Sequence, residues 1–514
     1  MKKLVMPIVT IAAACLIAHG ARADWTWNGG NNADLSNSAN WTGTSGNYLF
    51  SSSASGLYLS QNWSCPASFM VSTDGATVSL ALGEGRTLSL TSTAHVSLMN
   101  CDNSTFELSS GTIDHTVNKE IYLLSPQTVS NTKRYTNNTF RITGSGTLLQ
   151  TINKAVISAK GSKGTFEITD GAEFKGGIRF YGNATTDQTV LVRNGGTLTS
   201  YMTSGGECAY PSQGGGGTGC TTIVDGGTLT AKTLSFVDKG WKFEVKNGGK
   251  AQFSAHGSYL GKNTSFNEIT VGDGGVLESK TTNNGQFFIG NGNGSTGNVV
   301  RVHSGGTMRF TDNFGDNESC SYGKFELGYG EGSVSNRLEV LGGTLVTDRV
   351  YVGGDTTTAS SGNAVVVSNG TMKTWHVAFS QKGGENALEI AGTNPVITTQ
   401  SQMTFTNCVI TLDFADGAYT GVPLQAQAGS LVFNNGTTFA LENVKAVRSA
   451  GGAKVTVARR TAGAITLAAG LLDTWNAALA ADDETRGCAF SLANDGKDLT
   501  LKLSSTLGMM VIVR

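Results

Sequence analysis

The chain has 514 residues, with 37 lysine and arginine residues against 38 aspartate and glutamate residues and a formal net charge of -1. This balance argues against a nucleic-acid binder or a polybasic membrane-surface protein, because both need a clear excess of Lys and Arg. Glycine is abundant at 69 residues and proline scarce at 6, which argues against disordered and collagen-like chains, since both are normally proline-rich.

The first segment has the pattern of an export signal. Lys2 and Lys3 precede an apolar run from Leu4 to Ala18, and Ala21 and Ala23 form a small-residue cleavage site. We therefore predict a signal peptide over residues 1–23 and a secreted or cell-surface protein exported by a Sec-type route. The apolar run is shorter than the about 20 residues of a spanning helix, so we expect no transmembrane segment after signal removal.

Residues 24–104 are predicted to form an N-terminal cap and the first coils of a repeat array. Four of the seven tryptophans lie here, at Trp25, Trp27, Trp41 and Trp63. Aromatic side chains at this density are suited to cover the open end of a stack. The alternative is a sugar-stacking platform, which makes the four tryptophans candidate carbohydrate-binding residues.

Residues 105–425 repeat one sequence motif, which we call the Gly-Gly-Thr phrase. It consists of an apolar-x-apolar strand, a few polar residues, a glycine turn and then Thr-Leu or Thr-Met. The clearest copies are Gly195-Gly196-Thr197-Leu198, Gly226-Gly227-Thr228-Leu229, Gly305-Gly306-Thr307-Met308, Gly342-Gly343-Thr344-Leu345 and Asn369-Gly370-Thr371-Met372. Nine intervals between Gly111 and Gly370 average about 29 residues. Each repeat holds two or three short segments of period two, separated by glycine, Asn or Asp turns.

Such a unit cannot bury its apolar face alone, so we expect neighbouring repeats to stack into one continuous core. The predicted fold is all-β, a right-handed parallel β-helix, or β-solenoid, with terminal caps. A β-propeller is the alternative, although its blades need about 40 to 45 residues. Glycine interrupts most windows that a helical repeat would require.

Residues 426–514 are predicted to form a C-terminal β region or cap. Leu471 to Asp483 has the pattern of a short helix. Cys488 to Leu503 is predicted to form a hairpin that turns at Asn494-Asp495-Gly496, because Asp-Gly suits the positive φ angles of tight hairpin turns.

The cysteines and histidines give little evidence of a metal site or a catalytic site. Seven dispersed cysteines follow the predicted signal, without the spacing of a zinc site or a disulfide scaffold. Cys208 and Cys220 flank a glycine-rich loop and are a candidate disulfide; we expect the others to be buried as small hydrophobic residues. Cys15, inside the predicted signal, leaves lipid attachment as an alternative. The five histidines after the signal lack metal-ligand spacing, and we expect them on the surface or in turns.

The best carboxylate cluster is Asp312, Asp316 and Glu318 in one loop. These residues are a candidate metal site, with calcium the only cofactor that the sequence leaves open. Their spacing matches no complete calcium loop, and the alternative is a solvated insertion.

The start of the predicted mature chain supports a resemblance. Trp25-Thr26-Trp27-Asn28-Gly29-Gly30, then Ser38-Ala39-Asn40-Trp41, together with the Gly-Gly-Thr-Leu repeats, resembles bacterial exported β-helix proteins with autotransporter-passenger-like repeats. The resemblance implies a surface or secreted module, commonly structural or adhesive.

We therefore expect an exported structural or adhesive β-solenoid without catalytic activity, with polysaccharide or other surface proteins as partners and no nucleic acid. The alternative is a carbohydrate-active β-helix enzyme, a polysaccharide lyase or glycoside hydrolase, which needs clustered carboxylates. Acidic side chains gathered on one exposed face of consecutive coils would favour the enzyme. A uniform Ser, Thr and Asn face would favour the structural module.

Overall fold

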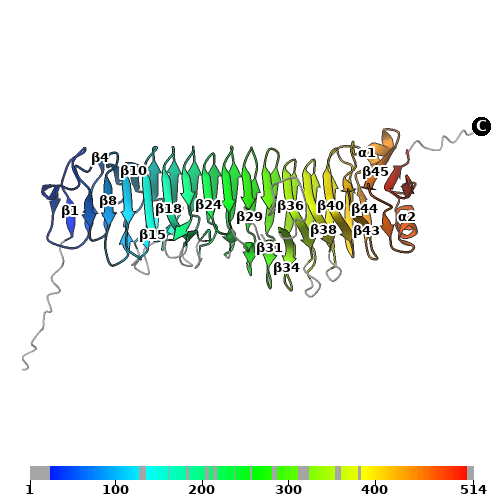
Figure 1. Cartoon of the computed structure of the whole chain (residues 1–514), viewed down its shortest axis with the longest axis horizontal. Helices are drawn as coiled ribbons and strands as arrows, with labels where there is room; N and C mark the ends of the chain where they lie inside the picture. The colour runs from blue at the N-terminus through cyan, green and yellow to red at the C-terminus, as the bar shows by residue number, and fades with distance from the viewer. Residues whose placement is uncertain are drawn as a thin grey trace, which may run out of the picture.

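The computed structural model describes residues 24–126, 135–159, 161–180, 185–202, 206–207, 209–211, 217–236, 238–254, 257–279, 286–310, 323–353, 360–379 and 384–505. The described chain forms one elongated stack of coils, with the N-terminal segment at one end and the C-terminal segment at the other (Figure 1). Long parallel sheets run the length of the stack. The predicted parallel β-helix is confirmed, and the propeller is excluded because sequence-adjacent repeats pair in parallel rather than forming separate blades.

One 15-stranded sheet makes the first face of the stack. Fourteen steps of about 4.8 Å between neighbouring strands make this face about 67 Å long. Its strands, in spatial order, are β4 (Ala54–Leu57), β7 (Thr77–Ala81), β10 (Thr105–Ser110), β14 (Thr139–Thr143), β17 (Thr165–Thr169), β19 (Thr189–Arg193), β23 (Thr221–Asp225), β26 (Lys242–Lys246), β29 (Glu268–Val271), β32 (Val299–His303), β35 (Arg337–Leu341), β37 (Ala364–Ser368), β39 (Asn386–Ala391), β41 (Cys408–Asp413) and β44 (Thr438–Glu442).

A 25-stranded sheet makes the other two faces. Strands β36 and β38 belong to both faces, because their first halves pair on the second face and their second halves on the third. The strands are β5 (Trp63–Cys65), β8 (Thr87–Leu90), β9 (Val96–Ser97), β11 (Thr112–His115), β12 (Ile121–Tyr122), β15 (Leu148–Val156), β18 (Glu173–Arg179), β20 (Thr197–Thr199), β24 (Thr228–Ala231), β25 (Ser235–Phe236), β27 (Lys250–Phe253), β28 (Ser258–Lys262), β30 (Val276–Ser279), β31 (Gln286–Asn291), β33 (Thr307–Phe310), β34 (Lys324–Tyr329), β36 (Thr344–Val352), β38 (Thr371–Phe379), β40 (Val396–Phe405), β42 (Leu424–Ala426), β43 (Ser430–Phe433), β45 (Ala453–Arg460), β46 (Thr466–Leu467), β47 (Ala489–Ala493) and β48 (Asp498–Leu503).

The repeated Gly-Gly-Thr phrase is the corner between the first and second faces. The first glycine has a left-handed backbone, as at Gly305 with φ +75°, which L side chains rarely adopt. The second lies against the preceding coil: a Cβ on Gly306 would be 2.3 Å from the Val271 carbonyl oxygen. Thr307 then faces outward and Met308 is buried, so each residue of the phrase has its own structural reason.

The core is continuous along the stack because inward side chains repeat in register. Phe106, Phe140 and Phe166 are fully buried on successive strands of the first face, with ring centroids 5.4 and 5.6 Å apart. Identical neighbours at this spacing pack ring upon ring, and their burial is the main stabilising contribution of the fold.

A buried asparagine ladder accompanies this core. Each side-chain amide donates to the Oδ1 of the next asparagine, with N–O distances of 2.9 to 3.2 Å. The same Oδ1 atoms accept a backbone N–H from the preceding coil. Each buried amide is thereby paired within the stack. The ladder consists of Asn267, Asn298, Asn336, Asn363 and Asn386.

The N-terminal end is closed by strands that leave the parallel pattern. Strand β1 (Trp25–Trp27) pairs antiparallel with β2 (Trp41–Thr42) and parallel with β3 (Tyr48–Phe50), and β6 (Phe69–Val71) follows β3. The short helix η1 (Ser38–Asn40) precedes β2. Two small sheets lie elsewhere along the stack, β13 (Tyr135–Thr136) with β16 (Gly161–Ser162) and β21 (Tyr201–Met202) with β22 (Gly206–Glu207).

The C-terminal end is closed by α2 (Leu471–Ala481) and the antiparallel strands β47 and β48, which confirms the predicted helix and hairpin. Trp475 of α2 donates to the Thr437 carbonyl oxygen at 2.8 Å and packs against Phe439 of β44. The helix α1 (Val444–Ser449) was not predicted; its Arg448 donates to the Ser504 and Arg486 carbonyl oxygens. Among the described residues, each helix is too short or too polar to cross a bilayer.

Candidate functional site

The four predicted tryptophans lie together in the N-terminal cap, mostly inside it. Trp27 and Trp41 are only 4% and 6% exposed, and each contacts Phe50. These two pack into the core of the cap, as the capping interpretation expects, and their carbohydrate-binding role stays a prediction. Trp25 and Trp63 are half-buried, and for them a sugar-binding role stays a prediction.

The predicted metal and disulfide residues fall largely outside the described chain. Asp312, Asp316 and Glu318 lie outside the described residues, as does Cys208. Cys220 is buried, with its Sγ atom 4.0 Å from the Thr218 carbonyl oxygen, and the disulfide stays a prediction. In the ranges that the structure describes, no group of three His, Cys, Asp or Glu side chains is placed to hold a metal ion.

Four further cysteines, Cys65, Cys101, Cys408 and Cys488, are buried and free, as expected of small hydrophobic residues. Loss of solvation raises the pKa of Cys65 and of Cys408 to about 12. These thiols therefore stay protonated near neutral pH, which argues against a nucleophilic role for them.

The histidine prediction needs one correction. His115 is fully buried, because it takes an inward position on β11, where its Nδ1 lies 3.1 Å from the Thr151 hydroxyl oxygen. Burial, with a smaller contribution from His95, lowers the pKa of His115 to about 4. His95, His303 and His376 are half-exposed, and His256 lies outside the described residues.

The carboxylates on the outer surface of the first face alternate with arginines instead of gathering. Glu167 lies between Arg141 and Arg193, with N–O distances of 2.6 and 2.5 Å, and Arg141 also contacts Glu107. The hydrogen bond to Glu167 is the main reason that the pKa of Arg141 is raised. Each of these carboxylates faces arginine and not a second carboxylate, which is not the pair of neighbouring carboxyl groups that a glycoside hydrolase uses.

A second alternating set lies further along the same face. Arg301 contacts Glu268 and Glu339, and Arg337 contacts Glu339 and Glu389. The two sets form charge ladders across successive strands, as expected where opposite charges face each other on neighbouring strands.

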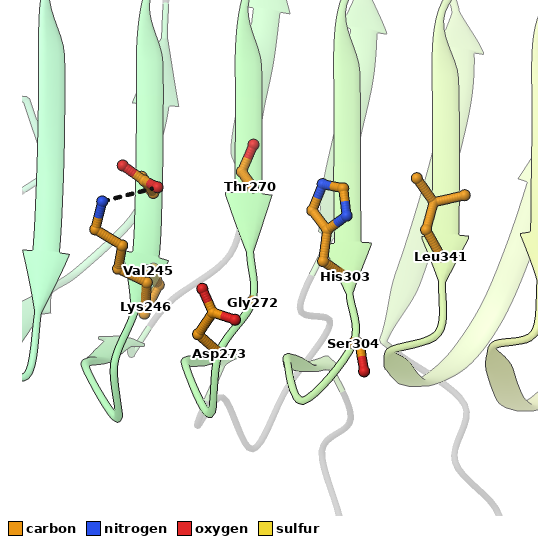
Figure 2. Close-up of a pocket in the computed structure, with 9 residues that line it drawn as sticks. Val245, Lys246, Thr270, Gly272, Asp273, His303, Ser304 and Leu341 are labelled. Atoms are coloured by element: carbon orange, nitrogen blue, oxygen red, sulfur yellow. Dashed lines mark ion pairs between the residues drawn. The ribbon is translucent and has the colours of Figure 1, made fainter.

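One interruption of this outer surface forms a cavity of about 410 Å³, which we call the notch. It lies at the ends of β26, β29 and β32, where Figure 2 shows Lys246, Thr270 and His303 on neighbouring strands. Gly272 and Asp273 also line it. The volume lies in the range of about 300 to 1,000 Å³ that is usual for small-molecule sites.

The notch exists because one outward side chain is missing. Val271 pairs with Val245 on one side and with Val302 on the other. The residues that follow these three valines are Lys246, Gly272 and His303, and they therefore lie side by side on three neighbouring strands. Gly272 has no side chain at this position, where a Cβ would lie 3.3 Å from the His303 Cβ. Lining up the repeats by their Gly-Gly pairs shows the same gap in the sequence, with glycine at 272 where the neighbouring repeats have Lys246 and His303.

The polar groups around the notch differ in their pairing. Lys246 Nζ lies 3.1 Å from Glu244 Oε1, the dashed pair in Figure 2. Within the described ranges, the Asp273 carboxylate and the His303 ring have no hydrogen bond or ion pair with another side chain. The Asp273 carboxylate and the His303 imidazole are therefore the polar groups available at the notch, since the Lys246 ammonium is turned toward Glu244 and away from Gly272 (Figure 2).

Comparison of the chain with protein-family models, with curated proteins and with solved structures finds no match.

Proposed function

We propose that the protein is an exported β-solenoid that acts as a structural and adhesive element of the cell surface, without catalytic activity. The observation that carries this proposal is the continuous hydrogen-bonded sheet of the first face, in which 15 strands stack between closed ends. A rigid rod of this kind holds groups at a fixed distance from its point of attachment, which is the property that a surface spacer needs.

The outer surface of the first face supports the same role. A threonine column occupies the first position of six successive strands, each threonine opposite the next. It consists of Thr77, Thr105, Thr139, Thr165, Thr189 and Thr221. Beside it, the carboxylates Glu107 and Glu167 are paired with arginine. A hydroxyl-rich face with neutralised carboxylates favours a structural surface over a hydrolytic groove.

The export part of the proposal is tested by cell fractionation. Cells that express the chain would be labelled with a membrane-impermeant amine reagent, and the N-terminus of the labelled protein would be mapped. The proposal predicts surface labelling and a mature chain that starts at Asp24. Recovery of the unlabelled protein in the cytoplasm with residues 1–23 intact would contradict it. An abundant cytoplasmic enzyme from the same cells serves as the control for membrane leakage.

A further inference from the structure

We propose that the turn around Phe266 binds an acidic polysaccharide, with a sugar ring packed on the phenyl ring and its carboxylates near two lysines. This inference rests on the adhesive part of the proposed function and names the ligand class and the residues that hold it. The site consists of Lys239, Tyr259, Lys262 and Phe266, which we call the aromatic corner.

Phe266 occupies a backbone position that does not suit it. In each turn from the third face to the first, one residue has a left-handed backbone and donates its N–H to a carbonyl oxygen of the next coil. Phe266 takes this position with φ +61° and donates to the Thr296 carbonyl oxygen. Bulky side chains rarely adopt this backbone, because the Cβ crowds the following carbonyl oxygen. The same position in neighbouring coils is taken by Asn137, Lys163, Asp187, Gly219, Gly240 and Gly297.

Burial does not explain the phenyl ring either. Phe266 is 58% exposed, more than any other large hydrophobic residue that the structure describes. The next coil leaves room for its ring, since a Cβ on Gly297 would lie 2.9 Å from Phe266 Cδ1. Phe266 therefore combines a strained backbone with an exposed ring that adds little to the core. Strain that folding does not require is characteristic of functional sites.

Two lysines give the aromatic corner a positive charge. Lys239 Nζ lies 5.3 Å from the centre of the Phe266 ring, and Lys262 Nζ lies 5.0 Å from the centre of the Tyr259 ring. Both lysines are exposed, and in the described chain neither has an ion pair. Even with Asp238 counted beside Lys239, the corner keeps a net positive charge. Because a cation–π contact at an exposed site is weak, each ammonium can turn to an anionic ligand.

The surroundings of the Phe266 ring favour a sugar over a protein partner. Protein interfaces bury a cluster of apolar side chains inside a polar rim. The Phe266 ring lies instead beside Ser265, Thr296 and Gly297, which are polar or lack a side chain. The C–H face of a pyranose can pack on one aromatic ring, and its hydroxyl groups can bond to the serine and the threonine. The carboxylate of a uronate unit can then accept a charge-assisted hydrogen bond from Lys239.

The test is a titration of the purified mature chain by calorimetry with trigalacturonate, neutral maltotriose and a blocked triglutamate peptide of the same charge as trigalacturonate. Phe266→Asn removes the ring and suits the left-handed backbone, as Asn137 does at the same position. Phe266→Tyr keeps an aromatic ring, and Lys239→Gln removes the ammonium beside it. The matched control is Lys163→Gln, which removes an exposed lysine from the same position of an earlier coil.

We expect the wild type, Phe266→Tyr and Lys163→Gln to bind trigalacturonate, and Phe266→Asn and Lys239→Gln to bind it at least about tenfold more weakly. The melting temperature of Phe266→Asn should equal or exceed that of the wild type, because the strain of the left-handed backbone is relieved. A lower melting temperature would show that the ring serves stability and would overturn the inference.

Three binding results would also overturn it: no binding of trigalacturonate by the wild type, equal binding by Phe266→Asn, or equally tight binding of maltotriose or triglutamate. Full retention of Phe266→Asn on an intact polysaccharide would overturn the inference, place adhesion elsewhere and leave the proposed function standing. Cytoplasmic recovery with residues 1–23 intact would remove the proposed function whatever the aromatic corner binds.

Discussion

Single residues in the corner turns show that glycine serves different purposes within one motif. In the turn after β29, a Cβ on Gly275 would meet the Val245 carbonyl oxygen at 2.3 Å, whereas a Cβ on Gly272 would meet only a side-chain atom, the His303 Cβ, at 3.3 Å. The two are three residues apart and look alike in the sequence. Only the contacts between stacked coils show which of the two glycines the fold requires.

We predict opposite outcomes for alanine at these two glycines. Gly275→Ala puts a Cβ 2.3 Å from a backbone oxygen, which must displace one coil from the next and should lower the free energy of unfolding by about 3 kcal/mol or more. Gly272→Ala should change it by no more than about 0.5 to 1 kcal/mol, in either direction. Urea denaturation of both variants measures the difference, and equal losses would contradict this view of the turn.

We also predict a stability loss in acid that depends on His115. Because burial lowers its pKa to about 4, the unfolded chain binds a proton between pH 6.5 and 4 that the folded chain does not. The stabilisation by neutral His115 is present above about pH 6.5 and is lost as the pH falls toward 4, by roughly 3 kcal/mol.

The matched variant is His115→Leu, since Leu90 takes the same inward position one strand earlier. The wild type should lose more stability than His115→Leu between pH 6.5 and 4 in urea denaturation. Parallel pH profiles for the two proteins would show that His115 does not contribute this dependence.

Sequence patterns predict single residues well only where the reason is local. The Gly-Gly-Thr phrase and the alternation around it place turns and inward residues correctly. His115 was missed because a polar residue was assigned to the surface, although its strand position points inward. The notch was not predicted because it results from a side chain that is missing between two neighbouring coils, and the sequence of a single repeat does not show this.

At the level of elements, features that one segment marks by itself can be predicted from the sequence, whereas features that depend on the stacking of coils cannot. The helix α2 and the hairpin of β47 and β48 were predicted because turn residues and apolar spacing mark them within one segment. The asparagine ladder was not predicted, although a Ser/Thr-x-x-Asn pattern recurs at Thr264, Ser295, Ser333 and Ser360. Its meaning depends on register between coils, which one repeat does not show.

We predict that the ladder is a cooperative element. Asn336→Leu removes the acceptor for the Asn298 backbone N–H and side-chain amide, and buried polar groups left unpaired cost about 1 to 3 kcal/mol each. The free energy of unfolding should fall by about 2 to 4 kcal/mol. Asn394→Leu, at an exposed position, should change it by less than about 0.5 kcal/mol. A similar small loss in both variants in thermal or urea unfolding would contradict the prediction.

The whole molecule is defined by its closed ends as much as by its repeats. Strand β44 is the last strand of the first face, and Trp475 of α2 covers it through contacts with Thr437 and Phe439. An uncovered strand of this kind is a template for another chain. The cap therefore keeps the stack from extending into a neighbouring molecule, and capped termini are a general need of repeat proteins.

Removal of the C-terminal cap tests this directly. We predict that a chain ending at residue 442 associates end to end, whereas the full mature chain sediments as a single species. Analytical ultracentrifugation of both proteins at equal concentration measures the difference. A truncated chain that stays folded and monomeric would show that the cap is not needed to protect the edge.

The central claim, a surface element that holds polysaccharide without cutting it, is tested most directly by incubation with a panel of polysaccharides. The mature chain would be incubated with each polymer, with and without calcium, while retained protein and new reducing ends are measured together. We predict retention on at least one acidic polysaccharide with no increase in reducing ends. Release of new reducing ends would contradict the claim and favour a carbohydrate-active enzyme.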